Sequence, residues 1–251
     1  MIPMITTATE MKNNFGQYLK QVMDEDIEVI ITKNSQKVAR LVPYITDLEK
    51  YFRVEDNTAE YRVIDKQTVS YEEFMEISEN SNSRMEYING AIYLMSSPSF
   101  QHQDILGNLH VLFKQYFKGK KCEPFLSPFD VHFHKIDIDV PDVMQPDLLV
   151  ICDFEGLINE KGKYMGTPTL VLEILSKSTR SKDMVIKLNT YIMSGVGEYW
   201  IVDPKNKNIM VYMFKDHTIE QFTVYRMGET VKSDTFEGLE VDVKELFEGL
   251  S

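Results

Sequence analysis

The sequence predicts an α/β (α+β) protein: a mixed β-sheet flanked by helices, preceded by a small α+β module. Helix-like and strand-like segments alternate along most of the chain without a strict βαβ rhythm, which favours a sheet of mixed strand direction. In addition, the first 48 residues form a helix and a hairpin that stand apart from the rest. We therefore divide the chain into a module at 1–48, a polar linker at 49–69 and a main domain with a C-terminal extension at 70–251.

The N-terminal module begins with one predicted amphipathic helix. Thr7 and Glu10 have the spacing of a capping box, which is typical of a helix start. The apolar side chains that follow at helical spacing are Met11, Phe15, Leu19 and Val22. Two strand-like runs, 28–32 and 37–42, flank the turn KNSQ and predict a hairpin. Because so short a segment buries little apolar surface, we expect it to dimerise or to dock.

The main domain supplies the remaining elements. A predicted helix over 70–80 precedes two short strands around Asn89-Gly90, a dipeptide that strongly favours a hairpin turn. The longest predicted helix covers 99–119, and another covers about 181–194. The strand candidates that complete the domain are 123–134, 145–153, 169–175, 198–204 and 208–214.

Composition limits the classes of function. The chain lacks both the apolar run that spans a bilayer and the pattern of a signal peptide, so we expect no membrane contact and a cytoplasmic location.

Cys122 and Cys152 match neither a disulfide framework nor a zinc site, and we expect two buried free thiols. A net charge of −12 excludes indiscriminate coating of DNA but leaves room for a local basic strip.

Two acidic residues interrupt aliphatic strands. Glu173 lies in the run LVLEIL, and Asp147 begins the run DLLVI directly after a proline, 26 positions earlier. A buried charge requires a cation, a metal or a proton. If the two strands are neighbours, the two carboxylates meet on one sheet, and a divalent metal relieves their repulsion. Mg²⁺ fits best, with Mn²⁺ as the alternative, because it takes oxygen ligands and shares them with phosphate.

A basic strip follows the second strand. The segment KSTRSKDMVIK has a net charge of +3 and contains Lys177, Arg180, Lys182 and Lys187. We expect Arg180 and Lys182 to meet a substrate phosphate, although a solvated surface turn has the same composition. Lys187 lies on the flank of the predicted helix, from which a lysine can bury its stem and extend its amine toward the sheet.

The first 48 residues resemble the DNA-binding half of the Phd/YefM antitoxin family. The resemblance rests on two sequence segments, MITTATEMKNNFGQYL and VIITKNSQKVARLVP. The resemblance implies a homodimer, binding to operator DNA and a toxin–antitoxin partner. The module departs from the family at Ser35-Gln36-Lys37, where the family has a Gly-Lys-Pro type turn, and its net charge through Leu48 is −1. A module for dimerisation alone is the alternative.

Two acids and a nearby lysine resemble the active-site signature of PD-(D/E)XK nucleases. Residues 70–214 further resemble the Uma-two family of restriction endonucleases, through RMEYINGAIYLMSSP, SFQHQDIL, QPDLLVICD and LVLEILSKSTRSKDMVIKLNTYIMSGVGEYWIVDP. This resemblance implies a restriction-endonuclease-like fold. The residues to which it assigns roles are Asp147 and Glu173 as metal ligands, Lys187 as the catalytic lysine, and Glu86 and His102 as supporting residues. Because Leu175 occupies the usual place of the lysine, Lys177 is a second candidate for that role.

These observations predict a metal-dependent endonuclease that acts on DNA. Two alternatives stay open: a non-catalytic DNA-binding or toxin–antitoxin partner protein that uses the nuclease fold as a scaffold, and a dimeric protein that binds no nucleic acid. Each acid also has a structural interpretation. Asp147 could cap a strand end, and Glu173 could form an ion pair with Lys187 that serves stability alone.

Overall fold

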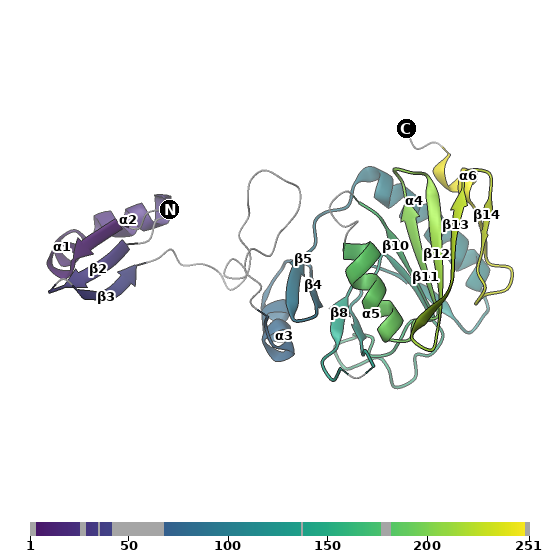
Figure 1. Ribbon diagram of the computed structural model, residues 1–251, viewed down its shortest axis with the longest axis horizontal. Coiled ribbons are helices and arrows are strands. Elements are labelled where there is room, and N and C mark those ends of the chain that lie inside the picture. Colours follow the sequence, from purple (N-terminus) through teal and green to yellow (C-terminus); the bar gives the residue numbers. More distant parts are fainter. Residues whose placement is uncertain are drawn as a thin grey trace. The chain divides into compact units, whose positions relative to one another are not determined.

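The computed structural model describes residues 4–25 (the backbone only from 23), 29–34, 36–41, 68–136, 138–176 and 182–248. The chain forms two compact units, Met1–Lys50 and Tyr51–Ser251 (Figure 1). The predicted linker at 49–69 lies outside the described residues except for its last two positions.

The N-terminal unit is a three-stranded sheet with two helices. Its strands are β1 (Met4–Thr7), β2 (Val29–Lys33) and β3 (Gln36–Leu41) in the order β1-β2-β3, and its helices are α1 (Ala8–Asn13) and α2 (Phe15–Glu25). The predicted hairpin is confirmed, because β2 and β3 pair antiparallel. The sequence did not reveal β1, which pairs parallel with β2.

The prediction of one continuous N-terminal helix is wrong. Thr7 does cap α1, since its hydroxyl accepts a hydrogen bond from the backbone N–H of Glu10 at 3.2 Å. The helix is interrupted at Asn14, whose φ of −124° is not helical. Asparagine side chains compete for backbone hydrogen bonds and disfavour helix interiors. The two consecutive residues Asn13 and Asn14 therefore account for the interruption. Of the predicted apolar stripe, Phe15 and Leu19 are exposed by 50% and 37%.

The second unit is built on a six-stranded mixed sheet. Its strand order is β13-β12-β11-β10-β9-β6. The strands are β6 (Glu123–Leu126), β9 (Leu148–Ile151), β10 (Leu170–Ile174), β11 (Glu198–Asp203), β12 (Asn208–Lys215) and β13 (Thr218–Arg226). Strands β10 and β11 pair parallel, whereas the other neighbours pair antiparallel. The predicted mixed sheet is confirmed.

Two smaller sheets complete this unit. The first has the order β5-β4-β8-β7 and contains β4 (Met85–Ile88), β5 (Ala91–Leu94), β7 (Val131–Phe133) and β8 (Asp142–Met144); the second pairs β14 (Thr230–Lys232) with β15 (Glu240–Asp242). The predicted hairpin turn is confirmed, with positive φ at Asn89 and Gly90. The prediction of a single strand over 123–134 is wrong, because this segment forms two strands in different sheets, β6 and β7, and the bend between them contains Pro128.

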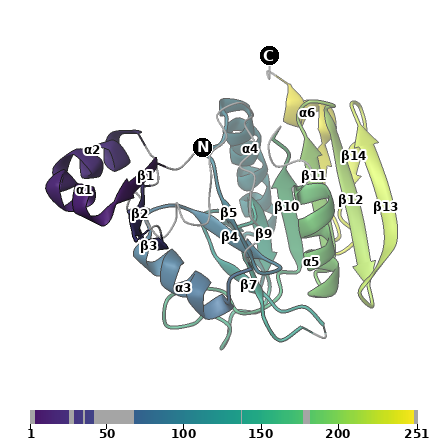
Figure 2. The same ribbon diagram turned by 60° about the vertical axis from the view of Figure 1, so that its left-hand side comes forward.

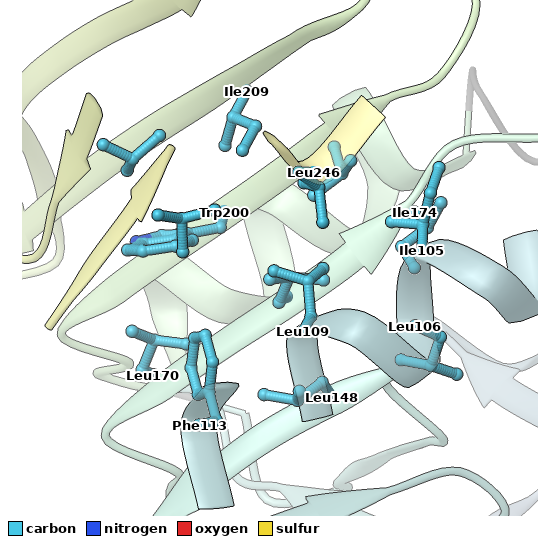
Figure 3. Packing of buried hydrophobic residues seen from close by; sticks show 14 of the residues in the cluster. Ile105, Leu106, Leu109, Phe113, Leu148, Leu170, Ile174, Trp200, Ile209 and Leu246 are labelled. Atoms are coloured by element: carbon cyan, nitrogen blue, oxygen red, sulfur yellow. The ribbon is translucent and has the colours of Figure 1, made fainter. Parts of the chain in front are cut away.

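Helices cover both faces of the six-stranded sheet. These are α4 (Phe100–Phe117), the π-helix η1 (Lys182–Lys187), α5 (Leu188–Met193) and α6 (Val243–Phe247). The helix α3 (Tyr71–Asn80) packs instead against β4 of the four-stranded sheet, where Phe74 stacks on Tyr87. Apolar side chains of α4 and α6 pack with Leu148, Leu170 and Trp200 on one face (Figure 3). On the other face α5 lies across β10 and β11 (Figures 1 and 2). No helix among the described residues is long and apolar enough to cross a membrane.

The prediction of two free thiols is wrong. Cys122 and Cys152 form a disulfide, and their Cα atoms lie 4.0 Å apart. The antiparallel register of β6 and β9 pairs Glu123 with Ile151, so the two cysteines are the next opposite positions. The pairing depends on which strands become neighbours, and the 30-residue separation gave no sign of it.

Candidate active site

Asp147 and Glu173 meet where β9 and β10 lie side by side. The antiparallel register pairs Leu148 with Leu172, so Asp147 and Glu173 are the next opposite positions. Opposite residues of antiparallel strands point to the same face of a sheet. The expectation that two adjacent strands bring these acids together is therefore confirmed.

Asp147 is held by two donors on one oxygen. Its Oδ2 accepts a hydrogen bond from the backbone N–H of Ile174 at 2.8 Å and another from Nε2 of His102 at 3.0 Å. His102 lies in the first turn of α4, where the cap residue Ser99 accepts a hydrogen bond from its backbone N–H. Among the described residues no donor bonds Asp147 Oδ1, and the side chain is 14% exposed.

Glu173 is buried against a lysine and a tyrosine. Its Oε1 accepts hydrogen bonds from Lys187 Nζ at 2.7 Å and from the Tyr191 hydroxyl at 2.6 Å. Within the described residues Oε2 has no donor. Burial raises the pKa of Glu173 to about 8; the charge of Lys187 opposes this rise, and the neighbouring carboxylates, including that of Asp147, add to it. A further cation beside Glu173 would lower this pKa again.

Glu86 connects two lysines at the base of the site. It lies on β4 and is fully buried. Its Oε1 is 2.8 Å from Lys187 Nζ and accepts a hydrogen bond from the backbone N–H of Gln145 at 3.1 Å, while its Oε2 accepts from Lys182 Nζ at 2.7 Å. Burial alone would raise the pKa of Glu86, but the charges of Lys187 and Lys182 outweigh burial and lower it to about 2. Glu86 is therefore ionised at neutral pH.

The π-helix explains how both lysines reach one carboxylate. Lys182 and Lys187 are five residues apart, at the first and last positions of η1. In an α-helix that spacing places side chains about 140° apart around the axis, whereas the i→i+5 repeat of a π-helix brings them onto nearly the same side. Such single π turns occur frequently at functional sites.

The helix that follows η1 is anchored by a second buried polar group. Asp142 Oδ2 accepts hydrogen bonds from the Thr190 hydroxyl of α5 at 2.6 Å and from Lys135 Nζ at 2.8 Å. Lys135 also donates to Asn89 Oδ1 at 2.6 Å, in the turn that connects β4 and β5. Because Thr190 is one turn beyond Lys187, this cluster fixes the helix that delivers Lys187 to Glu173.

The residues present fit a single divalent ion with oxygen ligands. Asp147 Oδ1 and Glu173 Oε2 are carboxylate oxygens without a donor among the described residues, and carboxylates are the ligands that Mg²⁺ prefers. In the described part of the chain no group of three or more His, Cys, Asp or Glu side chains could hold a metal. Two protein carboxylates suffice for Mg²⁺, which keeps several waters and shares substrate phosphates.

Most of the residues singled out from the sequence come together here. The structure gathers Asp147, Glu173, Lys187, Glu86, His102 and Lys182 into one connected set. Lys177 and Arg180 lie outside the described residues.

Tyr191 and Asp183 belong to this set, but the sequence did not point to them. Tyr191 is four positions from Lys187, which places both on one helical face, and this spacing was the available signal. Asp183 Oδ1 lies 3.7 Å from Lys187 Nζ; it shares the segment of the basic strip but gave no sign of facing inward.

Comparison with known structures defines the class of fold. The crystal structure of a putative nuclease belonging to DUF820 from Anabaena variabilis superposes with a TM-score of 0.58 at 21% identity, over 71% of this chain and 97% of that one. The chain therefore has the restriction-endonuclease-like fold that its sequence predicts. An uncharacterized protein from Synechocystis is 26% identical over 184 residues, which cover 73% of this chain and 93% of that protein.

Family comparison assigns the chain itself. Residues 71–244 match the Uma2 family, described as "Putative restriction endonuclease". Since the match covers well over half of the sequence, the protein belongs to the Uma2 family. Residues 4–61 match a second family, described as "Antitoxin Phd_YefM, type II toxin-antitoxin system". The resemblances to the Uma-two family and to the Phd/YefM antitoxin family are thus confirmed.

Proposed function

We propose that this protein is a metal-dependent endonuclease of the PD-(D/E)XK type that hydrolyses phosphodiester bonds in DNA. The observation that carries the proposal is the meeting of Asp147 and Glu173 on neighbouring strands, with the ammonium group of Lys187 on Glu173. The description of the Uma2 family and the similar crystal structure of a nuclease support the class of reaction.

Asp147 and Glu173 would hold the metal, Mg²⁺ or Mn²⁺. When bound, such an ion lowers the pKa of a coordinated water and offsets the charge that develops on a phosphoryl group. The remaining residues orient the two ligands. His102 and the Ile174 backbone fix Oδ2 of Asp147, whereas no donor in the described part of the chain bonds Oδ1. Lys187 and Tyr191 likewise fix Oε1 of Glu173 and leave Oε2 available.

Nicking of supercoiled plasmid tests this proposal. We expect the wild-type protein to nick DNA with Mg²⁺ or Mn²⁺ but not with EDTA, and we expect Asp147→Ala and Glu173→Ala each to abolish the reaction. Glu123→Ala is the matched control, since Glu123 is an exposed carboxylate that pairs with Lys114, and it should cleave like the wild type. Equal cleavage by all four proteins would remove the hypothesis.

For the N-terminal unit we propose dimerisation and placement on DNA. Apolar side chains on its surface support the first role: Ile5, Phe15 and Val38 are exposed by 63%, 50% and 54%. The antitoxin family match extends the proposal to a toxin–antitoxin partner. Light scattering of the full chain should give the mass of a homodimer, and Phe15→Glu should shift it to that of a monomer. A monomeric wild type would contradict this proposal.

A non-catalytic DNA-binding protein or toxin–antitoxin partner is the second candidate. It is favoured by Leu175, which fills the usual place of the catalytic lysine and is only 6% exposed, within an apolar cluster. In that case a gel shift should appear without metal, and no cleavage should occur across a wide screen of metals. The cytoplasmic location stays a prediction.

A further inference from the structure

The ammonium group of Lys187 is buried among carboxylates. Its ammonium group lies 2.7 Å from Glu173 Oε1, 2.8 Å from Glu86 Oε1 and 3.7 Å from Asp183 Oδ1, and its side chain is 2% exposed. A lysine has three N–H donors and no acceptor. Glu86 and Glu173 lie within hydrogen-bond distance of this ammonium group, and the carboxylate of Asp183 lies beside it at ion-pair distance. With 2% of the side chain exposed, Lys187 is closed off from water and from a phosphate of a bound substrate.

Lys182 is more exposed than Lys187 and, in the described part of the chain, has fewer carboxylates around its ammonium group. Its Nζ donates to Glu86 Oε2 at 2.7 Å, and Glu86 is the carboxylate that bonds it among the described residues. Its side chain is 14% exposed, against 2% for Lys187. The centroid of the Tyr93 ring lies 5.6 Å from Nζ, at the distance of a cation–π contact. Lys182 thus retains donors that point away from Glu86.

Glu86 couples the two lysines. One of its oxygens faces Lys187 and the other faces Lys182, so a single buried anion fixes both ammonium groups in the site that contains Glu173. Both lysines come from η1, whose π geometry brings residues five apart to one side. The usual signature has one lysine, whereas the described part of this site contains two, and their different surroundings suit them to different roles.

We propose that Lys182 is the lysine that contacts the scissile phosphate, and that Lys187 is a positioning residue that orients Glu173 and Glu86. The proposal rests on the nuclease function proposed above and revises the role that the sequence assigned to Lys187. It also accounts for Leu175, because a lysine held by Glu86 on η1 can supply the positive charge that the strand lacks.

The test compares Lys182→Gln and Lys182→Arg with the wild type. Loss of the positive charge beside the charge that develops in the transition state should lower kcat by roughly 10²–10³-fold. Because Glu86 also loses one of its two cations, the melting temperature should fall, and the rates are compared at a temperature at which every variant is folded. Lys182→Arg, which keeps the charge, should recover part of the rate. The control is Lys114→Gln, which removes an exposed lysine paired with Glu123 and should leave the rate unchanged.

Salt dependence of binding provides a readout that a structural role would not change. With Ca²⁺ in place of Mg²⁺, the slope of log affinity for a short DNA duplex against log salt should fall by about one for Lys182→Gln, as expected for the loss of one phosphate contact. Lys114→Gln should keep the wild-type slope.

The outcomes separate this proposal from the proposed function. If the wild type nicks plasmid and Asp147→Ala does not, but Lys182→Gln matches the wild type in both rate and slope, the assignment of Lys182 is wrong while the nuclease function stands. If the wild type does not cleave at all, the nuclease function fails, and the binding slope alone decides whether Lys182 contacts phosphate. Lys187→Gln should lower the melting temperature without changing the slope; a lower slope for that variant would overturn the proposal.

Discussion

Replacing Glu86 by glutamine removes the buried anion that holds Lys182 and Lys187. The pKa of Glu86 lies at about 2, against 4.5 for a free glutamate, and this difference corresponds to about 3 kcal/mol in favour of the charged, folded form. Breaking a buried ion pair by removing one partner costs a similar amount. We therefore expect Glu86→Gln to lower the free energy of unfolding by about 3 kcal/mol at pH 7.

The dependence on pH distinguishes the charge of Glu86 from simple packing. Because its pKa is depressed in the folded state, its contribution is fully present above the unfolded value of 4.5 and is lost as the pH falls toward 2. The difference between wild type and Glu86→Gln should be constant from pH 8 to about pH 5 and shrink below pH 4.5.

Urea unfolding followed by the fluorescence of Trp200 measures this difference. Trp200 is the single tryptophan and is fully buried in the second unit, so its signal reports on the unit that contains Glu86. The control is Glu123→Gln, which breaks an exposed ion pair and should cost less than about 1 kcal/mol. A loss below about 1 kcal/mol for Glu86→Gln, or a loss that persists at low pH, would refute the reasoning.

Three further predictions follow from the same geometry. Since the pKa of Glu173 is raised to about 8, protons compete with metal below that pH, and Mn²⁺ affinity measured by calorimetry should fall by up to about tenfold per pH unit; an affinity independent of pH contradicts this. Tyr191→Phe removes one donor to Glu173 but keeps the ring contacts with Phe133 and Tyr199, so urea unfolding should show a loss of about 1 kcal/mol, and a loss several times larger would mean that the hydroxyl does more than we infer. Reduction of the Cys122–Cys152 disulfide, which spans 30 residues, should lower stability by about 3 kcal/mol; an unfolding midpoint that is the same with and without reductant would argue against the bond.

The central part of the site could be predicted because its signals are local. Asp147 and Glu173 each interrupt an aliphatic run, and an acid inside a buried strand is costly unless it is compensated. The loop between the two runs made adjacent strands the simplest arrangement, and the register of β9 and β10 bears this out. Lys187 was identified as a candidate site residue because it lies on the flank of the predicted helix, from which its amine can reach the sheet.

Other parts of the site depend on contacts between distant segments. Glu86 lies 96 positions from Lys182, and the sequence around each residue does not predict that the two form an ion pair. The sequence reading also assumed an α-helix over 181–194, in which Lys182 and Lys187 point in different directions. In the structure Lys182–Lys187 is instead a π-helix, so the division of roles between these lysines was not visible from α-helical spacing.

The sequence by itself determined the elements whose causes lie within a few residues. These include the Asn89-Gly90 turn, the cap at Thr7, the aliphatic strands and the two acids that interrupt them, because turn chemistry, capping and periodicity act over short stretches of chain. Only the tertiary structure decided which strands became neighbours, and with them the Cys122–Cys152 bond and the burial of Glu86 between two lysines. The disulfide follows from the register of β6 and β9, and the burial of Glu86 follows from the contact between β4 and η1. Both depend on segments far apart in the sequence, which the free energy of the complete core brings together.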